Sequence, residues 1–164
     1  MTPAVPEPGT APPATAAASA ATAIANLVAT YAERVDLGDF TGVGELFRAA
    51  TYRAMVGDEV TTMEGAESVA AAMAGMVITY DGVPRTKHVT TNLIIEVDEQ
   101  AGTATCRSYF TVFQAVGDLP LQPIIAGRYH DRFALSGAAW RFTDRLIYSD
   151  LIGDLRQHLR ISPY

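Results

Sequence analysis

The sequence predicts an α+β domain in which helices come first along the chain and pack on one face of an antiparallel sheet. Residues 24–80 show the apolar periodicity of helices, whereas four later segments are rich in Thr, Val, Ile, Phe and Tyr. Turn-like stretches separate these four segments, as expected for a β-meander. The length of 164 residues suits one domain with a single core.

The helical part divides into three predicted helices. The first carries a stripe at Ile24, Leu27, Val28, Tyr31 and Val35, and Gly38 is expected to end it. Asp39 can cap a second, short helix. An extended stretch at 51–56 and a third helix over 65–80 follow, and the predicted strands lie near 86–98, 103–115, 121–135 and 139–150.

The ends of the chain differ in composition from the middle. Residues 1–22 are mostly Ala, Pro, Thr and Ser, which predicts a disordered tail and a poor signal peptide. The folded domain is expected over 23–150, and residues 151–164 are expected to form a partly helical tail. We expect no second domain and no repeat.

Charge and cysteine content exclude several classes of protein. The net charge is −6 with both signs interspersed, which argues against binding nucleic acid or an anionic membrane. The one cysteine, Cys106, lies in a predicted strand and is interpreted as a small buried hydrophobe. Its single occurrence rules out a disulfide within the chain and suits a cytoplasmic protein.

One predicted strand is apolar on both faces. Phe110 and Val112 lie on one side of it, and Tyr109 and Phe113 on the other. Because the helices can cover only one face, a second copy of the chain is expected on the other. We therefore expect a homodimer or homotrimer.

His88 and Asp36 are the candidate acid–base pair. Histidine is the side chain whose ordinary pKa suits proton transfer near neutral pH. Asp36 lies in the last turn of the first predicted helix, where the helix dipole disfavours a carboxylate by about 0.3–1 kcal/mol, so a cationic partner would compensate it. Strand alternation groups His88 with Thr90 and Asn92, a pattern that also fits a face in contact with water.

The ordered motifs resemble those of the SnoaL-like branch of the NTF2-like superfamily, over residues 22–150. The resemblance is carried by Tyr31-Ala-Glu-Arg-Val-Asp36, by His88 and the Thr-Thr-Asn that comes shortly after it, by Gly127-Arg-Tyr-His-Asp131 and by Trp140-Arg-Phe142. It implies a cone-shaped α+β barrel with three N-terminal helices packed on a curved antiparallel sheet.

The resemblance also implies roles for residues. Scytalone dehydratases and hexachlorocyclohexane dehydrochlorinases of this superfamily use a His–Asp dyad, whose positions match His88 and Asp36. Arg145 occupies the place of a pocket arginine in the dehydrochlorinases. A lysine of those enzymes has no counterpart here, and Tyr31 stands near its place, which argues against dehydrochlorination.

Other site residues follow from strand alternation and composition. Arg145 is expected on the face of Thr143 and Ile147, opposite Phe142, while His130 is interpreted as a surface residue and His158 as a tail residue. No metal site and no cofactor are expected. The residues expected to bind substrate are Tyr31, Tyr52, Tyr109, Tyr129, Phe113, Ile125 and Ile147.

These features favour a cofactor-independent lyase or isomerase, of dehydratase or cyclase type, that acts on an apolar natural-product intermediate. His88 would move the proton and Asp36 would orient its ring. Two alternatives stay open. One is a non-catalytic ligand-binding or structural subunit of the same fold, and the other is an epoxide hydrolase with Asp131 as its second acid.

Overall fold

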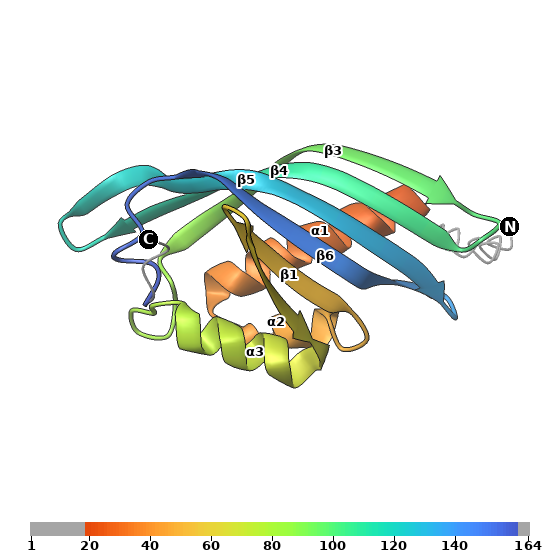
Figure 1. The fold of residues 1–164 in the computed structure, drawn as a ribbon, viewed down its shortest axis with the longest axis horizontal. Coiled ribbons are helices and arrows are strands. Elements are labelled where there is room, and N and C mark those ends of the chain that lie inside the picture. The colour runs from red at the N-terminus through yellow and green to blue at the C-terminus, as the bar shows by residue number, and fades with distance from the viewer. Residues whose placement is uncertain (1–18, 161–164) are drawn as a thin grey trace, which may run out of the picture.

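Three helices lie on one side of a curved sheet (Figure 1). The structure is a computed structural model, and it describes residues 19–160. The elements are α1 (Ala20–Leu37), α2 (Phe40–Leu46), β1 (Thr51–Val56), β2 (Glu59–Glu64), α3 (Gly65–Met76), β3 (Thr86–Asp98), β4 (Thr103–Val116), β5 (Leu119–Ser136) and β6 (Ala139–Ile152). This order confirms the predicted α+β class.

Helix α1 has the expected end and an earlier start. The Ser19 hydroxyl accepts a hydrogen bond from the Thr22 N–H, so the helix begins at Ala20. Gly38 ends it with a left-handed φ of 73°. The predicted tail of 1–22 is therefore too long at its C-terminal end, and its residues 1–18 lie outside the part that the structure describes.

The sheet has six strands in the order β2-β1-β6-β5-β4-β3. Strand β1 pairs parallel with β6, and every other pairing is antiparallel, so the sheet is mixed rather than wholly antiparallel. The sequence analysis missed β2 as a strand. This edge strand is exposed at almost every position, and it therefore lacks the apolar alternation by which strands are recognised.

The chain after α3 and the chain after β6 pair with each other. Helix α3 ends at Met76, four residues before the predicted end, because Val77 is extended and forms a β-bridge with Leu159. Residues 153–160 contain no helix, and the other residues of the predicted partly helical tail after Arg160 lie outside the part that the structure describes. His158 is buried, so its interpretation as a tail residue was wrong.

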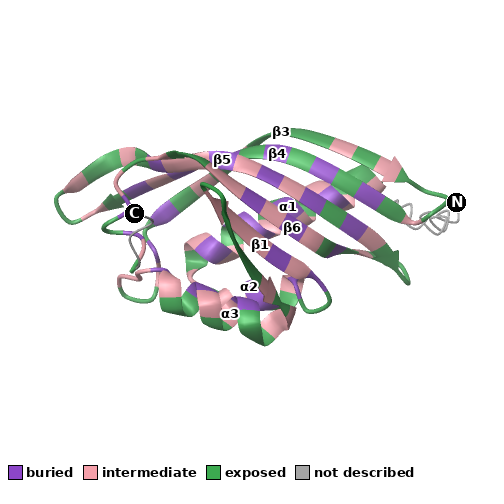
Figure 2. Ribbon diagram, in the orientation of Figure 1, coloured by how far each residue is buried: buried purple, intermediate pink, exposed green. Residues whose placement is uncertain are grey.

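Two β-bulges change which side chains face the helices. Buried and exposed residues alternate regularly along β4 (Figure 2). In β3 the pairing with β4 shifts by one residue between Thr91 and Ile94, and Asn92 there has a φ of 55°. In β6 the pairing with β5 shifts at Thr143. A one-residue shift moves the following side chains to the other face of a strand.

Candidate active site

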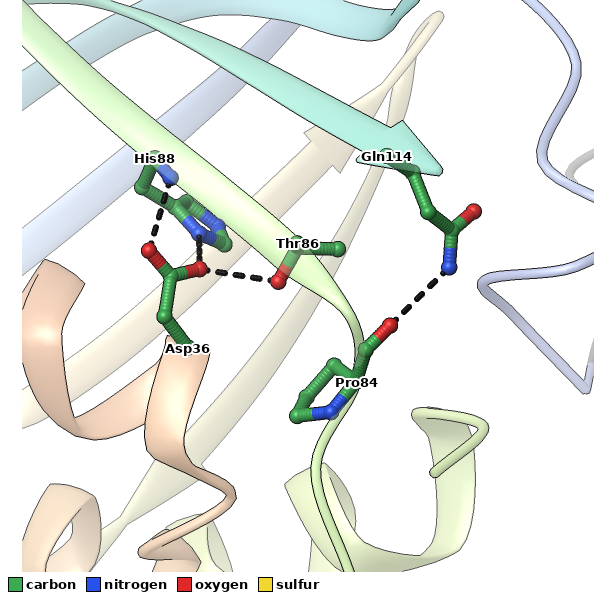
Figure 3. Close-up of polar contacts among 5 residues, drawn as sticks. All are labelled: Asp36, Pro84, Thr86, His88 and Gln114. Atoms are coloured by element: carbon green, nitrogen blue, oxygen red, sulfur yellow. Dashed lines mark hydrogen bonds and ion pairs between the residues drawn. The ribbon is translucent and has the colours of Figure 1, made fainter. Parts of the chain in front are cut away.

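The structure brings Asp36 and His88 into contact (Figure 3). The Nδ1 atom of His88 lies 2.7 Å from Oδ1 of Asp36, and each side chain is 7% exposed. An ionised carboxylate can only accept hydrogen bonds, so this contact assigns the ring proton to Nδ1 in the neutral imidazole. The other ring nitrogen, Nε2, then carries the free lone pair of a base.

Two further hydrogen bonds hold the Asp36 carboxylate. The backbone N–H of His88 donates to Oδ2 at 2.9 Å, and the Thr86 hydroxyl donates to Oδ1 at 2.8 Å. Burial opposes ionisation of Asp36, but the hydrogen bonds from His88 and Thr86 outweigh it and hold the pKa of this carboxyl below its usual value. Asp36 is therefore a carboxylate at neutral pH, although it lies at the unfavourable end of α1.

The strand register explains why His88 faces the protein rather than water. His88 pairs with Val112, and Thr86 pairs with Gln114, so all four side chains share the face that the helices cover. The neighbouring Val89 lies on the opposite, exposed face. The prediction that His88 and Thr90 share one face of the strand is therefore confirmed for the part of β3 before the bulge. That face is polar in sequence, but it packs against the protein and does not face water.

A groove between α1 and β3 gives access to the pair. It encloses about 390 Å³ and is lined by Asp36 and His88 together with Ala29, Ala32, Glu33, Leu37, Lys87 and Thr90. Its walls are apolar along α1, with one acidic and one basic side chain at Glu33 and Lys87.

Arg145 is buried next to Asp131, not next to His88. Its Nε and Nη2 atoms donate to the two Asp131 carboxylate oxygens at 2.8 and 2.7 Å, and both side chains are 0% exposed. The pKa of Arg145 is raised, because the Asp131 carboxylate outweighs the effect of burial. The remaining nitrogen, Nη1, has no hydrogen-bond partner among residues 19–160.

The prediction of which residues share a face with Arg145 was half right. Arg145 and Ile147 share the inner face, as expected, but Phe142 lies there too and Thr143 is exposed. The bulge at Thr143 causes this change. The guanidinium of Arg145 lies 4.2 Å from the ring centroids of both Tyr31 and Tyr129, so aromatic faces surround the cation.

The predicted substrate-binding residues separate into two groups. Tyr31, Tyr52, Tyr129 and Ile147 are buried on the inner side, and Ile125 packs against the same core. The Tyr31 and Tyr52 hydroxyls are 2.9 Å apart. Burial raises the pKa of each of these three tyrosines, so their hydroxyls keep their protons at neutral pH and can donate hydrogen bonds.

Tyr109 and Phe113 do not face the inner side. Tyr109 is 54% exposed and pairs across β4 and β5 with Arg128, which is ion-paired to Asp150 at the surface. Phe113 follows the buried Val112 on β4 and so projects to the same outer face as Tyr109. Their prediction as pocket residues was wrong, because an aromatic strand with two apolar faces does not reveal which face is inside.

Three residues near the pair were missed by sequence reasoning. Thr86 donates to Asp36, Gln114 lies across the ladder from Thr86, and His158 is buried nearby. Thr86 has a usable signal, since it lies two positions before His88 and therefore shares its face. No local pattern marks His158, because its burial depends on pairing between segments about eighty residues apart.

No group of three or more His, Cys, Asp or Glu side chains in the described part of the chain could hold a metal ion. Cys106 is fully buried, and burial raises the pKa of its thiol to about 11, which makes it a poor nucleophile. The groove offers one imidazole and one carboxylate held in place by hydrogen bonds, while the hydroxyls of Tyr31 and Tyr52 lie in the core and bond to each other.

The order of helices and the curved six-stranded sheet define an α+β protein with an NTF2-like fold. The structure is similar to an NTF2-like protein with a cystatin-like fold from Novosphingobium aromaticivorans, with a TM-score of 0.66 and 23% identity over 79% of this chain and 81% of that one. The chain belongs to the family of SnoaL-like domains, whose sequence model matches residues 16–146.

Two further solved structures share the fold. A candidate scytalone dehydratase from N. aromaticivorans has a TM-score of 0.63 and 17% identity, over 82% of this chain and 86% of that one. The β subunit of a candidate aromatic-ring-hydroxylating dioxygenase from the same organism has a TM-score of 0.66 and 19% identity, over 85% of this chain and 95% of that one. No curated protein matches the sequence. Within residues 19–160, no helix is long and apolar enough to span a membrane.

Proposed function

We propose that the protein is a cofactor-independent lyase or isomerase, of dehydratase or cyclase type, that acts on an apolar natural-product intermediate. The observation that carries this proposal is the 2.7 Å contact between His88 Nδ1 and Asp36 Oδ1 in a nearly buried pair. A carboxylate that fixes the tautomer of an imidazole and stabilises its cation is the arrangement required for general base catalysis. The fold shared with a candidate scytalone dehydratase supports the same class.

In a dehydration, Nε2 of His88 removes a proton from the carbon next to a carbonyl group. The electron pair of that C–H bond forms the new double bond, the neighbouring C–O bond breaks, and the leaving hydroxyl takes the proton from the imidazolium and departs as water. Asp36 stabilises the imidazolium between the two transfers. We assign the neutral hydroxyl of Tyr129, whose pKa the Asp36 carboxylate helps to raise, to the carbonyl oxygen, as a donor that strengthens as negative charge develops there. Arg145 lies next to Asp131 rather than His88, so we assign it no contact with the substrate.

The substrate can be sought directly. Native mass spectrometry of the purified protein identifies small molecules that co-purify, and turnover of such a compound is then compared between variants. We expect His88→Gln and Asp36→Asn each to lower kcat by about 10²–10⁴-fold, because each removes the acid–base function. His130 lies between the buried Tyr129 and Asp131 on β5 and so projects to the outer face, and His130→Gln, the matched control, should turn over at the wild-type rate. Equal rates in wild type and His88→Gln contradict the mechanism.

A non-catalytic role is the second candidate. The shared fold with a dioxygenase β subunit supports it, as does the exposed apolar surface of the sheet. Under this alternative the co-purifying compound is bound and released unchanged by every variant. Epoxide hydrolysis is less well supported, because Arg145 occupies both oxygens of Asp131, the second acid that such a reaction needs.

We also propose that a second copy of the chain covers the outer face of the sheet. Val89 on β3, Tyr109 on β4 and Leu151 on β6 are exposed on this face. The same face carries Arg128 and Asp150 side by side, so a twofold axis can set each charge opposite its complement. The expected assembly is a homodimer or homotrimer.

A further inference from the structure

A second groove, here called the Trp140 groove, lies where the helices meet the start of β6. It encloses about 370 Å³. Leu27 of α1, Leu46 of α2 and Trp140 of β6 line it, and each packs against the core while part of its surface stays exposed. The other lining residues are Glu45, Arg48, Ala49, Ser136, Arg141 and Phe142.

The backbone of β6 has a free edge at this groove. Strand β1 pairs with β6 only from Asp144 onward, so within the described chain residues 139–143 have β5 as their one neighbouring strand. Three consecutive residues, 140–142, line the groove, so the strand's backbone borders it as well as its side chains. The free edge of a strand offers N–H and C=O groups to an extended chain.

The charges of the Trp140 groove are unbalanced. Arg48 is ion-paired with Glu45, whereas Arg141 forms no ion pair with any residue between 19 and 160. The groove therefore combines an aromatic ring, apolar side chains, a free strand edge and one cation. It favours an extended occupant with small apolar side chains and one negative charge.

The sequence of residues 1–18 matches this description. It contains five of the nine prolines of the chain, and Glu7 is its only charged side chain. Proline-rich sequences favour the polyproline II conformation, in which the backbone makes no internal hydrogen bonds. Such sequences dock in aromatic-lined grooves at a low cost in entropy.

Residues 1–18 are attached within reach of the groove. They join the chain at Ser19, the N-cap of α1, and Leu27 lies eight residues further on, which is about 12 Å along the helix axis. A polyproline II chain advances about 3.1 Å per residue, so roughly four residues span this distance. Helix α1 also begins at the end of the sheet where β5 turns into β6 (Figure 1). Glu7, twelve residues before Ser19, can therefore reach Arg141.

We propose that residues 1–18 dock in the Trp140 groove of their own chain. The prolines pack against the Trp140 ring, the carbonyl groups accept hydrogen bonds from the free edge of β6, and the Glu7 carboxylate pairs with Arg141. The point of attachment, the opposite charges and the aromatic wall beside a free edge support this occupant. The Trp140 groove shares no lining residue with the groove at His88, so the docking does not depend on the proposed function.

Fluorescence of the full chain tests the docking, because Trp140 is its only tryptophan. Thr10→Cys, one polyproline II turn after Glu7, carries a nitroxide, which quenches an indole near contact. Cys106 is fully buried and should not react with the label. We expect the nitroxide at position 10 to quench Trp140, and chemical reduction of the nitroxide to restore the emission.

The matched control is Asp118→Cys with the same label, at the β4–β5 turn and the far end of the sheet (Figure 1). It should leave the emission of Trp140 unchanged. Absence of quenching from position 10, or equal quenching from both positions, overturns the proposal. Labelled Thr10→Cys/Trp140→Phe that quenches unlabelled wild type would place the segment in the groove of a second copy, and it would overturn docking within one chain.

Charge reversal tests the contact between Glu7 and Arg141. Glu7→Lys and Arg141→Glu should each weaken docking by up to about fivefold, the value of an exposed ion pair, and thus raise the quenching of Trp140 by acrylamide. The double variant Glu7→Lys/Arg141→Glu restores opposite charges and should return to the wild-type value. Asp118→Lys, the control for charge, should match the wild type. A double variant no closer to the wild type than the single variants contradicts the pairing of Glu7 with Arg141.

Discussion

At the scale of single residues, the inner side of the sheet holds an unusual amount of buried charge. Arg145 and Asp131 form a bidentate pair with no exposed surface, and Asp36 is held by His88 and Thr86. Buried ions are tolerated only where partners replace the lost hydration. Each of these groups therefore depends on a specific neighbour, and removal of one partner should have a large effect.

Removal of Arg145 should destabilise the protein strongly. Arg145→Leu leaves the Asp131 carboxylate buried without its partner, and we expect the free energy of unfolding in urea to fall by about 3–5 kcal/mol. The double variant Arg145→Leu/Asp131→Leu removes both charges and should recover a large part of that loss. A double variant no more stable than Arg145→Leu would show that the guanidinium contributes through its aromatic contacts instead.

Acid should destabilise the protein through His158. Its pKa is about 4 in the folded protein against an ordinary 6.5, so the unfolded chain binds more protons between these values. The contribution of neutral His158 to the free energy of unfolding is therefore fully present above pH 6.5. It falls by up to about 3 kcal/mol as the pH is lowered to 4. The pKa of Asp36 is lowered in the folded protein, so protonation of Asp36 causes a further loss of stability below its usual pKa of 3.8. Thermal unfolding of His158→Phe should depend less on pH in the 4–6.5 window; an identical dependence would contradict this assignment.

At the scale of elements, β3 buries even-numbered residues in its first half and odd-numbered residues in its second half. His88 and Thr86 face the helices before the bulge, and Ile95 and Val97 pack against the core after it. In a strand without a bulge, residues 88 and 95 would face opposite sides of the sheet, because they are an odd number of positions apart. The bulge at Asn92 resolves this conflict and allows a polar site and an apolar core on one strand.

The bulge should be sensitive to the residue at position 92. Asn92 has a φ of 55°, a conformation that asparagine and glycine tolerate and β-branched residues do not. Asn92→Val should lower the free energy of unfolding by about 1–3 kcal/mol. Asn92→Gly should be close to wild type, and both are measured by urea unfolding. A Val variant as stable as the Gly variant would show that the left-handed backbone at this position is not required.

At the scale of the whole molecule, the two faces of the sheet differ in what covers them. The helices cover the inner face (Figure 1). The outer face exposes Tyr109, Val89 and Leu151. Clusters of exposed apolar side chains on neighbouring strands mark surfaces that associate. The proposed homo-oligomer would bury them.

Substitution of apolar residues on the outer face by glutamate should dissociate the oligomer into monomers. Light scattering after size exclusion should report a dimer or trimer for the wild type and a monomer for Tyr109→Glu/Leu151→Glu, because burial of two carboxylates would cost more than the interface gains. Leu135→Glu is the matched control. Leu135 is also an exposed leucine, but it lies on the helix side of the sheet, two residues after the buried Phe133. A monomeric wild type would overturn the assembly.

The predictability of the site differs from residue to residue. Asp36 follows from its place in the last turn of an amphipathic helix. The register of β3 places His88 on the same face as the buried Thr86 and pairs it with the buried Val112. The faces of Phe142 and Ile95 could not be predicted, because bulges leave no reliable local pattern. The edge strand β2 was missed for a related reason, since it buries almost nothing.

The sequence by itself determined the α+β class, the order of helices and strands, and Asp36 and His88 as the residues to examine. These properties depend on local periodicity and on motifs, which each segment carries alone. Only the tertiary structure decided that Arg145 is neutralised by Asp131, that Tyr109 and Phe113 face outward, and that His158 is buried. The reason is physical: these contacts join segments far apart in the chain, and strand register and packing, rather than local pattern, set which side chains meet.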